Sequence, residues 1–398
     1  MIQSEEKGMT ALKSIKVLDL TRLLPGGYCT QLLGDMGAEI IKIEQPGIGD
    51  YMRWMPPHIK KESGLFLAIN RNKKSLTLNL KTSRGQEIFY RLVESADVII
   101  EGYRPGVVKR LGVDYVTVKT FNPKVIYCSL SGYGQDGPYR DWVGHDINYI
   151  GIGGILNITG TTEEPIIPGV QIADLAGGGM LAAIAILTAL FAREQTGIGQ
   201  YIDVAMLDGV VSWLSIHAGK YFVDQEIPIR GNMPLSGGTA SYNIYKTKDS
   251  KWISLGILEK QFWTNLCKVI GREDLEEAPY FELSNREELK SILQAIFRTK
   301  NQIEWIKLLN SADVPCGPIY TIDEVFKDPQ VLHRGMFREI DHPIEGRIKQ
   351  LGIPIKFSET PGQLRLPPPQ LGEHTVEILQ SLGYTDKQIQ DFRIKGVI

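Results

Sequence analysis

Short apolar runs alternate with longer amphipathic segments through the N-terminal half of the chain. Ile15–Leu20 predicts a buried strand, followed by a Gly-rich turn, a helix from about Tyr28 to Met36 and a second strand at Gly37–Ile43. This order is a βαβ unit, which requires parallel strands and places ligand sites at their carboxyl ends. The glycines of the turn do not follow GxGxxG spacing, so a nicotinamide cofactor is not indicated.

The same pattern repeats further along the chain, after an irregular polar stretch from Asp50 to Lys74. The predicted elements are strands at Ser75–Leu80, Asp97–Ile100, Val125–Leu130 and Gln200–Val204 and helices at Thr82–Glu94 and Met206–Ala218. Repeated strand and helix alternation predicts the α/β class with a parallel sheet in a large domain.

The pattern changes from about Gly231. Two short strands at Tyr242–Tyr245 and Lys251–Leu255 indicate a small antiparallel sheet, and Gln261–Gly271 and Arg286–Phe297 are helical in pattern. We therefore expect a large domain whose N-terminal part spans 1–230, a smaller α+β domain at 231–330 and a C-terminal segment, 331–398, that returns to the large domain. The last segment contains several prolines and a helix candidate at Glu373–Gly383.

Composition narrows the class of protein. The 398 residues are 43% hydrophobic, enough for about two or three domains, and the net charge of −2 argues against a nucleic-acid partner. The N-terminus lacks the pattern of a signal peptide, and the longest apolar run, Met180–Ala192, is too short to cross a bilayer. We therefore expect a cytoplasmic protein without a membrane partner. The cysteines have no zinc-site spacing and are expected to be buried free thiols: Cys29, Cys128, Cys267 and Cys316.

Two residues stand out as candidates for chemistry. His145 in GHDINY and Asp174 in IADLAGGGM each stand where a helix is predicted to begin, the second after a strand-like segment that ends at Ala173. Free N–H groups at a Gly-rich helix start can hold a developing oxyanion. A His and an Asp that face one carbon can exchange the α-proton of a thioester. Alternatively, Asp174 alone can attack the thioester as a nucleophile.

Each candidate also has a structural interpretation. His145 can be a hydrogen-bonded structural residue, Asp174 a helix N-cap, and Asp146 either an orienting partner of the His145 imidazole or a cap. The glycines after Asp174 can merely permit tight packing of the helix against the sheet. The basic residues are either phosphate ligands of a nucleotide-bearing molecule or a solvated face: Arg71, Lys73, Lys74, Arg104 and Arg110.

Motifs along nearly the whole chain resemble the family III CoA-transferases, a family that also contains the α-methylacyl-CoA racemases. They are VLDLTRLLPGGYCTQLLGDMGAEIIKIE, SLTLNLK, ADVIIEGYRPGVVKRLG, SGYGQDGP, GHDINY, IADLAGGG, TGIGQYIDVAMLDG and GEHTVEIL. The resemblance implies a Rossmann-like large domain built from both chain ends, a small middle domain and an interlocked homodimer. It also implies an acyl-CoA substrate, no metal and no cofactor other than the CoA thioester itself.

The resemblance leaves two reactions open. Transferases of the family use the Asp that matches Asp174 to form an acyl anhydride, whereas the racemases use that Asp and the His that matches His145 as two bases. The racemases also carry a Glu, matching Glu259 of GILEKQF, that supports the His and is expected from the partner subunit. Because all three residues are present, the favoured reading is racemisation of 2-methylacyl-CoA thioesters through an enolate, with Asp146 as a further orienting residue.

Other positions favour the alternative, transfer of CoA between carboxylic acids through an Asp174 anhydride. Val170 stands where racemases often have Asn, and Gln45 replaces an Arg that racemases place after the second strand. A third reading, a CoA-binding or scaffolding protein, fits the intact His, Asp and Glu set less well. The resemblance also carries over contacts with the substrate or CoA to Leu23, Asn79, Leu80, Lys81, Gly102, Arg104, Arg110, Gly144, Asn148 and Tyr149.

Overall fold

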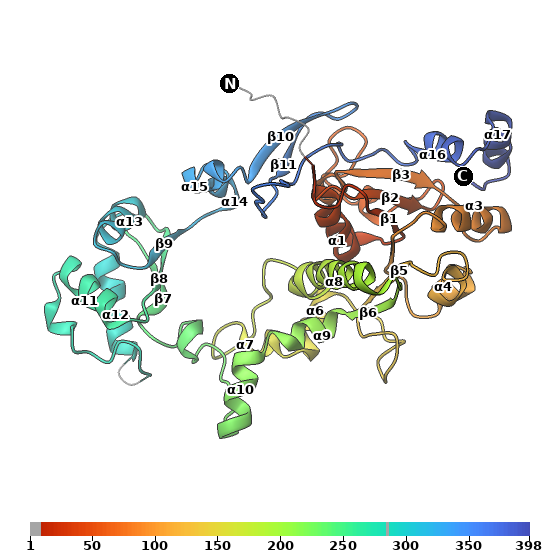
Figure 1. Ribbon diagram of the computed structural model, residues 1–398. Helices are drawn as coiled ribbons and strands as arrows, with labels where there is room; N and C mark the ends of the chain where they lie inside the picture. Colours follow the sequence, from red (N-terminus) through yellow and green to blue (C-terminus); the bar gives the residue numbers. More distant parts are fainter. Residues whose placement is uncertain (1–8, 284–285) are drawn as a thin grey trace. The chain divides into compact units, whose positions relative to one another are not determined.

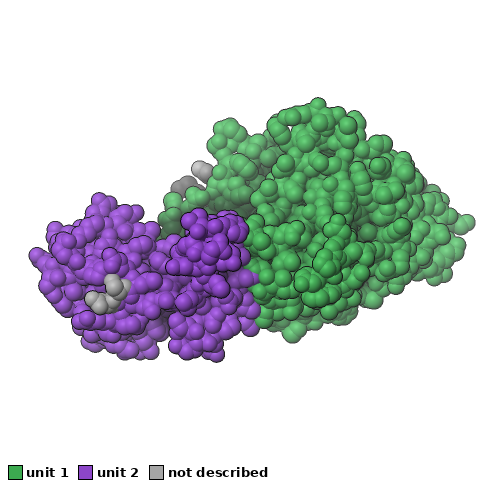
Figure 2. All heavy atoms as spheres, turned by 90° about the horizontal axis from the view of Figure 1, so that it is seen from below, with its two compact units in different colours: residues 1–153, 170–213, 329–398 green, residues 154–169, 214–328 purple. Residues whose placement is uncertain are grey.

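The computed structural model describes residues 9–283 and 286–398. The chain divides into two units, which Figure 2 colours separately. Unit 1 comprises Met1–Gly153, Val170–Trp213 and Pro329–Ile398, and unit 2 comprises Gly154–Gly169 and Leu214–Asp328. The segments 154–169 and 214–230, which we expected in the large domain, therefore belong to the same unit as the small antiparallel sheet.

A six-stranded parallel sheet forms the centre of unit 1 (Figure 1). Its order is β3-β2-β1-β4-β5-β6, so the chain reverses direction across the sheet between β1 and β4, as in Rossmann folds. The strands are β1 (Lys16–Asp19), β2 (Glu39–Glu44), β3 (Lys73–Thr77), β4 (Val98–Glu101), β5 (Ile126–Ser131) and β6 (Tyr201–Ala205). The predicted α/β class with a parallel sheet is confirmed.

Side chains in register across the strands divide the sheet into two faces. Leu18, Ile99 and Tyr127 share one face and pack against helices from both ends of the chain. In Figure 1, α16 and α17 lie beside α3, and Phe89 of α3 joins the same core as Phe392 of α17. The helices on this face are α3 (Ser83–Val93), α4 (Val107–Arg110), α5 (Tyr115–Val118), α16 (Thr375–Ser381) and α17 (Asp386–Ile394).

The opposite face packs against α1 (Leu23–Asp35) and α8 (Leu181–Thr196). Helix α1 begins at Leu23, before the predicted start at Tyr28, because a proline is tolerated in the first turn of a helix. Gly26 allows that turn to approach β1, since a Cβ there would lie 2.2 Å from the Cβ of Thr21. The stretch predicted to be irregular contains two short helices, η1 (Tyr51–Trp54) and α2 (Gly64–Ile69).

The segment before Asp174 is not a strand, so this prediction is wrong. Ala173–Met180 forms a π-helix, η2, that continues directly into α8. Together Ala173–Thr196 is long and apolar enough to cross a membrane by length and composition, which the shorter apolar run did not indicate. The same segment packs against α1 and the helix α9 (Met206–Ser212) inside unit 1, as the core helix of a folded domain does.

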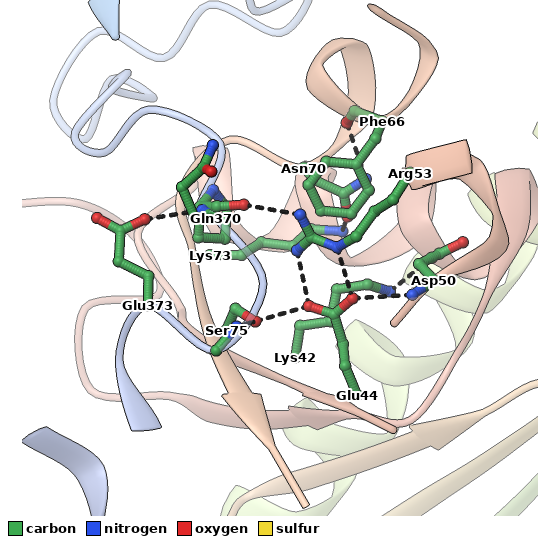
Figure 3. A network of polar contacts seen from close by, with 12 residues as sticks. Lys42, Glu44, Asp50, Arg53, Phe66, Asn70, Lys73, Ser75, Gln370 and Glu373 are labelled. Atoms are coloured by element: carbon green, nitrogen blue, oxygen red, sulfur yellow. Dashed lines mark hydrogen bonds and ion pairs between the residues drawn. The ribbon is translucent and has the colours of Figure 1, made fainter. Parts of the chain in front are cut away.

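Charged side chains are buried beside β2 and β3. Arg53 donates to both carboxylate oxygens of Glu44 at 2.8 Å and lies over the ring of Phe66, as Figure 3 shows. Arg71 makes a similar two-bond pair with Asp35. Arg71 and Lys73 are buried in such pairs, so neither the phosphate-ligand nor the solvated-face reading holds for them.

The C-terminal segment returns to unit 1 over this buried network. Arg53 also donates to the carbonyl of Pro369, and Arg71 donates to the carbonyl of Leu351. The other elements of this part are α15 (Pro329–His333) and the hairpin of β10 (Phe337–His342) and β11 (Gly346–Leu351).

Unit 2 contains a three-stranded antiparallel sheet covered by helices around Trp263 and Phe297. The predicted pair of strands acquires a third member from Cys316–Ile319. Its main elements are β7 (Tyr242–Lys246), β8 (Trp252–Gly256), β9 (Cys316–Ile319), α11 (Lys260–Val269), α12 (Arg286–Phe297) and α13 (Gln302–Ser311). Shorter helices are α7 (Ile155–Ile158), α10 (Ser215–Asp224), η3 (Pro234–Ser236), η4 (Glu273–Leu275) and α14 (Ile322–Val325).

Candidate active site

His145 begins α6 (Asp146–Ile152), as the sequence predicted. Its backbone N–H donates to the side-chain oxygen of Asn148 at 3.0 Å, which fixes the entry to the helix. The hydroxyl of Tyr149 donates to the carbonyl of Gly144 at 2.6 Å, and a Cβ on Gly144 would lie 2.8 Å from the same ring. Hydrogen bonds within the GHDINY motif therefore stabilise its turn. The His145 side chain remains exposed.

Asp146 connects this turn to the π-helix that carries Asp174. Its Oδ2 atom accepts the backbone N–H of Ala173 at 2.6 Å and that of Asp174 at 3.1 Å. Of its two predicted roles, the structure shows the cap, and it is the cap of η2 rather than of its own helix.

This capping occupies the first amides of the helix start at which the sequence predicted an oxyanion site. The N–H groups of Ala173 and Asp174 are occupied by Asp146, and the N–H of Leu175 donates to the carbonyl of Gln171 at 3.0 Å. An oxyanion would have to compete with a carboxylate already bound there. The first amides of η2 are therefore part of the scaffold.

The glycines after Asp174 serve close packing of backbones. A Cβ on Gly177 would lie 3.0 Å from the carbonyl oxygen of Met206, and one on Gly179 would lie 2.8 Å from that of Pro25. The triple glycine therefore allows close packing, as its structural interpretation expected, but the backbones that it approaches are those of the helices α9 and α1 and not those of the sheet. Its effect is to seat η2 between α9 and α1, which positions Asp174 through packing.

Asp174 itself has an unusual electrostatic environment. Burial and the nearby charge of Asp146 raise the pKa of the Asp174 carboxyl to about 6, although His145 acts in the opposite direction. No ion pair to Asp174 exists among the residues that the structure describes. Above pH 6 the group is an ionised carboxylate more basic than usual, which suits a nucleophile or a base.

A loop at the carboxyl end of β4 carries exposed residues of the expected CoA site. Gly102 and Arg104 are exposed in it. A Cβ on Gly106 would lie 3.8 Å from a guanidinium nitrogen of Arg110 and 3.6 Å from one of Arg140. The guanidinium groups of Arg110 and Arg140 thus lie near this loop, which itself carries the exposed Arg104, and arginines of this kind can bind phosphate groups. Arg140 was missed because its motif, SGYGQDGPYR, is read from sequence only as a turn.

The other expected contacts divide into accessible and structural residues. Leu23 adopts a left-handed conformation, φ +63°, with its N–H donating to Asp50 at 3.1 Å, a strained geometry of the kind often found at functional sites. Asn79 donates to the carbonyl of Gly396, and Leu80 is buried in the core. Lys81 is exposed.

Glu259 lies in unit 2, where it precedes α11 and is exposed. Its expected support of His145 stays a prediction. Among residues 9–283 and 286–398, no group of three or more His, Cys, Asp or Glu side chains could hold a metal ion.

Comparisons with known proteins match the whole chain. The model of the family "CoA-transferase family III" matches residues 12–375. The human protein named succinyl-CoA:glutarate CoA-transferase is 37% identical over 404 residues, covering 100% of this chain and 92% of that protein. The formyl-CoA:oxalate CoA-transferase of Rhodopseudomonas palustris BisB18 is 34% identical, covering 98% of this chain and 97% of that protein.

Solved structures agree with the fold. A CAIB/BAIF family protein from Brucella suis superposes with a TM-score of 0.84 at 34% identity, covering 94% of this chain and 100% of that one. A protein from Mycobacterium tuberculosis superposes with a TM-score of 0.80 at 28% identity, covering 93% and 99% of the two chains.

Proposed function

Because the chain belongs to the family III CoA-transferases, we propose that it transfers CoA from an acyl-CoA donor to a carboxylic acid, with Asp174 as the nucleophile. The observation that carries the proposal is the state of the Asp174 carboxyl. It is partly buried, has a pKa of about 6 and begins a helix that Asp146 caps. Both named relatives are CoA-transferases, which favours this alternative over the racemase reading.

The chemistry follows from an ionised carboxylate beside a thioester. An oxygen of Asp174 attacks the thioester carbonyl carbon, the C–S bond breaks and CoA leaves as a thiolate, so a mixed anhydride forms. The thiolate then attacks the Asp174 carbonyl carbon, releases the first acid and leaves CoA on Asp174 as a thioester. The acceptor carboxylate attacks the Asp174 carbonyl carbon of this thioester, its C–S bond breaks and a second mixed anhydride forms. The CoA thiolate then attacks the acceptor carbonyl carbon of that anhydride, which gives the acceptor acyl-CoA and frees the Asp174 carboxylate.

Two observations support the proposed substrates, an acyl-CoA and a short carboxylic acid. Arg110 and Arg140 lie near Gly106, and the exposed Arg104 belongs to the same loop, so these basic side chains are the candidates to bind the phosphates of CoA. The relatives are named for succinyl, glutarate, formyl and oxalate groups, so short carboxylic acids, dicarboxylates among them, are the first acceptors to test.

We also propose a homodimer, because each unit exposes large apolar side chains. Ile184 and Phe191 on α8 are 58% and 68% exposed, and Phe222 and Val223 on α10 are 73% and 87% exposed. Native mass spectrometry at micromolar concentration tests this. A stable monomer overturns the dimer and, with it, a role for Glu259 from a partner subunit.

The central experiment mixes succinyl-CoA with glutarate, or with oxalate, and follows CoA esters by liquid chromatography and mass spectrometry. We expect transfer by the wild type and a loss of about 10³-fold or more in Asp174→Asn, because the amide cannot form the anhydride. Asp208→Asn, an exposed carboxylate change on α9, is the matched control and should retain activity. Hydroxylamine should attack the activated carbonyl of Asp174, release the bound acid or CoA and leave a hydroxamate on the peptide that contains Asp174.

A second incubation, in deuterated water with a 2-methylacyl-CoA in place of succinyl-CoA, with and without the acceptor acid, separates the two reactions. Deuterium incorporation at Cα of a 2-methylacyl-CoA without any acceptor, combined with no CoA transfer, overturns the proposal and restores racemisation. Transfer that persists in Asp174→Asn also overturns it, because another residue would then carry the acyl group.

A further inference from the structure

Arg22 is a half-buried arginine between β1 and α1 to which the proposed chemistry assigns no role. Its Nη1 atom donates to the hydroxyl oxygen of Tyr51 at 2.9 Å. Its guanidinium carbon lies 5.0 Å from the ring centre of Tyr51 and 5.4 Å from that of Tyr103. The guanidinium is therefore held by two tyrosine side chains, one from the segment after β2 and one from the segment after β4.

This part of the sheet is where ligands bind in Rossmann-like folds. Asp19 at the end of β1 is in register with Ile100 of β4, and the strand order reverses between these two strands. The region outside the carboxyl ends of the strands at such a reversal is the usual ligand site of an open parallel sheet. Arg22 follows the end of β1 and Tyr103 follows the end of β4, so both belong to segments that border this region.

The backbone on both sides of Arg22 is fixed from inside the domain. The Nζ atom of Lys42 donates to the carbonyl of Thr21 at 2.9 Å, and a carboxylate oxygen of Asp50 accepts the N–H of Leu23 at 3.1 Å. Lys42 and Asp50 form an ion pair with each other at 2.9 Å, and their side chains are 0% and 1% exposed. The position of Arg22 is therefore set before any ligand binds, which lowers the entropy lost on binding.

The charge of the Arg22 guanidinium is not neutralised within the described part of the chain. No carboxylate among the described residues forms an ion pair with it, in contrast to the buried Arg53 and Arg71. The hydrogen bond to Tyr51 uses one of the five N–H groups that a guanidinium carries. Further donors and the full charge remain for a ligand, and they fit an anion with several oxygens.

We propose that Arg22 binds a phosphate group of CoA. The inference rests on the proposed function only in that CoA is a substrate. CoA carries a diphosphate and a 3′-phosphate, and each presents the several oxygens that a guanidinium binds through charge-assisted hydrogen bonds. Arg104, which is exposed on the segment that also carries Tyr103, adds a second cation to the same region.

The position of Arg22 favours CoA over the acid substrate. The reacting carboxylate of the acid must lie at Asp174, and the charges that act on the Asp174 carboxyl are those of Asp146 and His145. Arg22 is not among the charges that act there, so a short acid bound at Asp174 does not reach it. CoA is much longer and can extend from Asp174 to the carboxyl end of β1.

The test is isothermal titration calorimetry of the full chain with CoA, so that no turnover is needed. Arg22→Gln removes the charge and should weaken CoA binding about tenfold or more, as expected for a lost hydrogen bond to a charged group. Raising NaCl from about 50 mM to about 500 mM should weaken binding less in this variant than in the wild type, because one charge fewer is screened. Arg347→Gln, an exposed change of an arginine that already pairs with Glu339, is the matched control and should bind as the wild type does.

Dephospho-CoA, which lacks the 3′-phosphate, separates the two sources of phosphate. If the wild type and Arg22→Gln bind it equally, Arg22 contacts the 3′-phosphate. If the variant loses as much affinity for dephospho-CoA as for CoA, Arg22 contacts the diphosphate. Either result supports the inference.

Equal CoA affinities of the wild type and Arg22→Gln overturn the inference and leave the transferase proposal intact; a raised KM for the acid would then assign Arg22 to the acid carboxylate. Weaker binding with the salt dependence of the wild type also overturns it, because Arg22 would then only shape the neighbouring segments. Absence of CoA binding in the wild type overturns both proposals. If Arg22→Gln does not fold, a crystal structure of the wild type with CoA decides. Phosphate groups without a hydrogen bond to Arg22 overturn the inference, and a phosphate bound to its guanidinium supports it.

Discussion

The two halves of the parallel sheet differ in whether their buried carboxyl groups have a cationic partner. On the β1–β3 side, Asp19, Glu44 and Asp50 are buried next to lysine or arginine side chains. On the β4–β6 side and in the adjoining η2, Glu101 and Asp174 have no ion pair among the described residues. The two sides belong to one unit and one sheet, so the comparison separates the effect of a cation from that of burial.

Burial alone raises the pKa of every one of these carboxyl groups, because it disfavours the charged form. On the paired side the cations outweigh it: Lys42 and Lys73 lower the pKa of Asp19, and Arg53 lowers that of Glu44. On the unpaired side nothing opposes burial strongly enough, and the pKa rises to about 7 for Glu101 and about 6 for Asp174.

The paired carboxylates contribute to stability, whereas the unpaired carboxyl groups are the candidates for function. The paired carboxylates stay charged at neutral pH, and Arg53, the partner of Glu44, also donates to the carbonyl of Pro369 in the C-terminal segment. Unpaired carboxyl groups cost stability above their ordinary pKa, a cost that folded proteins accept mainly at functional sites. The unpaired side is therefore the side on which chemistry is expected.

The largest effect should come from removing a cation on the paired side. Arg53→Leu leaves Glu44 and Glu62 buried without their shared partner, so the free energy of unfolding should fall by about 3–5 kcal/mol. Denaturant unfolding at one fixed protein concentration measures it. Arg84→Leu removes an arginine from the exposed pair with Glu87, 50% and 53% exposed, and should cost no more than about 1 kcal/mol. If the two variants lose the same free energy of unfolding, burial does not decide how much an ion pair contributes.

The second prediction concerns the unpaired side, where removal of the charged group should raise the free energy of unfolding at neutral pH instead of lowering it. Glu101 has a raised pKa, so below its ordinary value of 4.5 it is protonated in both states and costs nothing. As the pH rises from 4.5 to 7, the unfolded state loses the proton first and stability falls by about 3 kcal/mol. Glu101→Gln abolishes this fall, so its stability relative to wild type should grow between pH 5 and pH 8. Thermal unfolding across that range checks it, and a constant difference would show that Glu101 does not titrate there.

Much of the fold was readable from sequence because parallel strands buried on both faces form continuous apolar runs. The runs around Val17, Ile40, Ile99 and Ile126 predicted four strands of the sheet within a residue or two. The start of α1 was missed because Pro25 and Gly26 suggest a turn, and only the contact of Gly26 with Thr21 shows why a helix suits them.

Part of the candidate site could be predicted from the sequence. The resemblance located Asp174 and His145, but the sequence could not show that Asp146 caps the helix of Asp174, because that contact joins two separate segments. The same limit applied to Arg71 and Lys73. Their neighbours in sequence are polar, and only the fold buries them among carboxylates.

A smaller effect is expected at Asp146, where two substitutions separate charge from geometry. Asp146→Asn keeps an acceptor for the N–H groups of Ala173 and Asp174 but removes the charge that raises the pKa of Asp174. The acid limb of the rate profile should therefore move to lower pH with little loss of stability. Asp146→Ala also removes the cap and should lower the free energy of unfolding by about 1–2 kcal/mol. If both variants lose equal stability, the cap does not depend on the acceptor.

The smallest effect is expected at His145, the residue that distinguishes the two reactions. A nucleophilic Asp174 needs no second base, and the imidazole is exposed, so His145→Gln should reduce kcat at pH 8 by less than about threefold. The positive imidazole lowers the pKa of Asp174, so its removal raises that pKa and should move the acid limb of the rate profile to higher pH. Initial rates from pH 5 to 8 measure both. A loss of about a hundredfold or more at pH 8, where Asp174 is ionised in either protein, would make His145 a catalytic base, because a change in the pKa of Asp174 cannot produce such a loss at that pH.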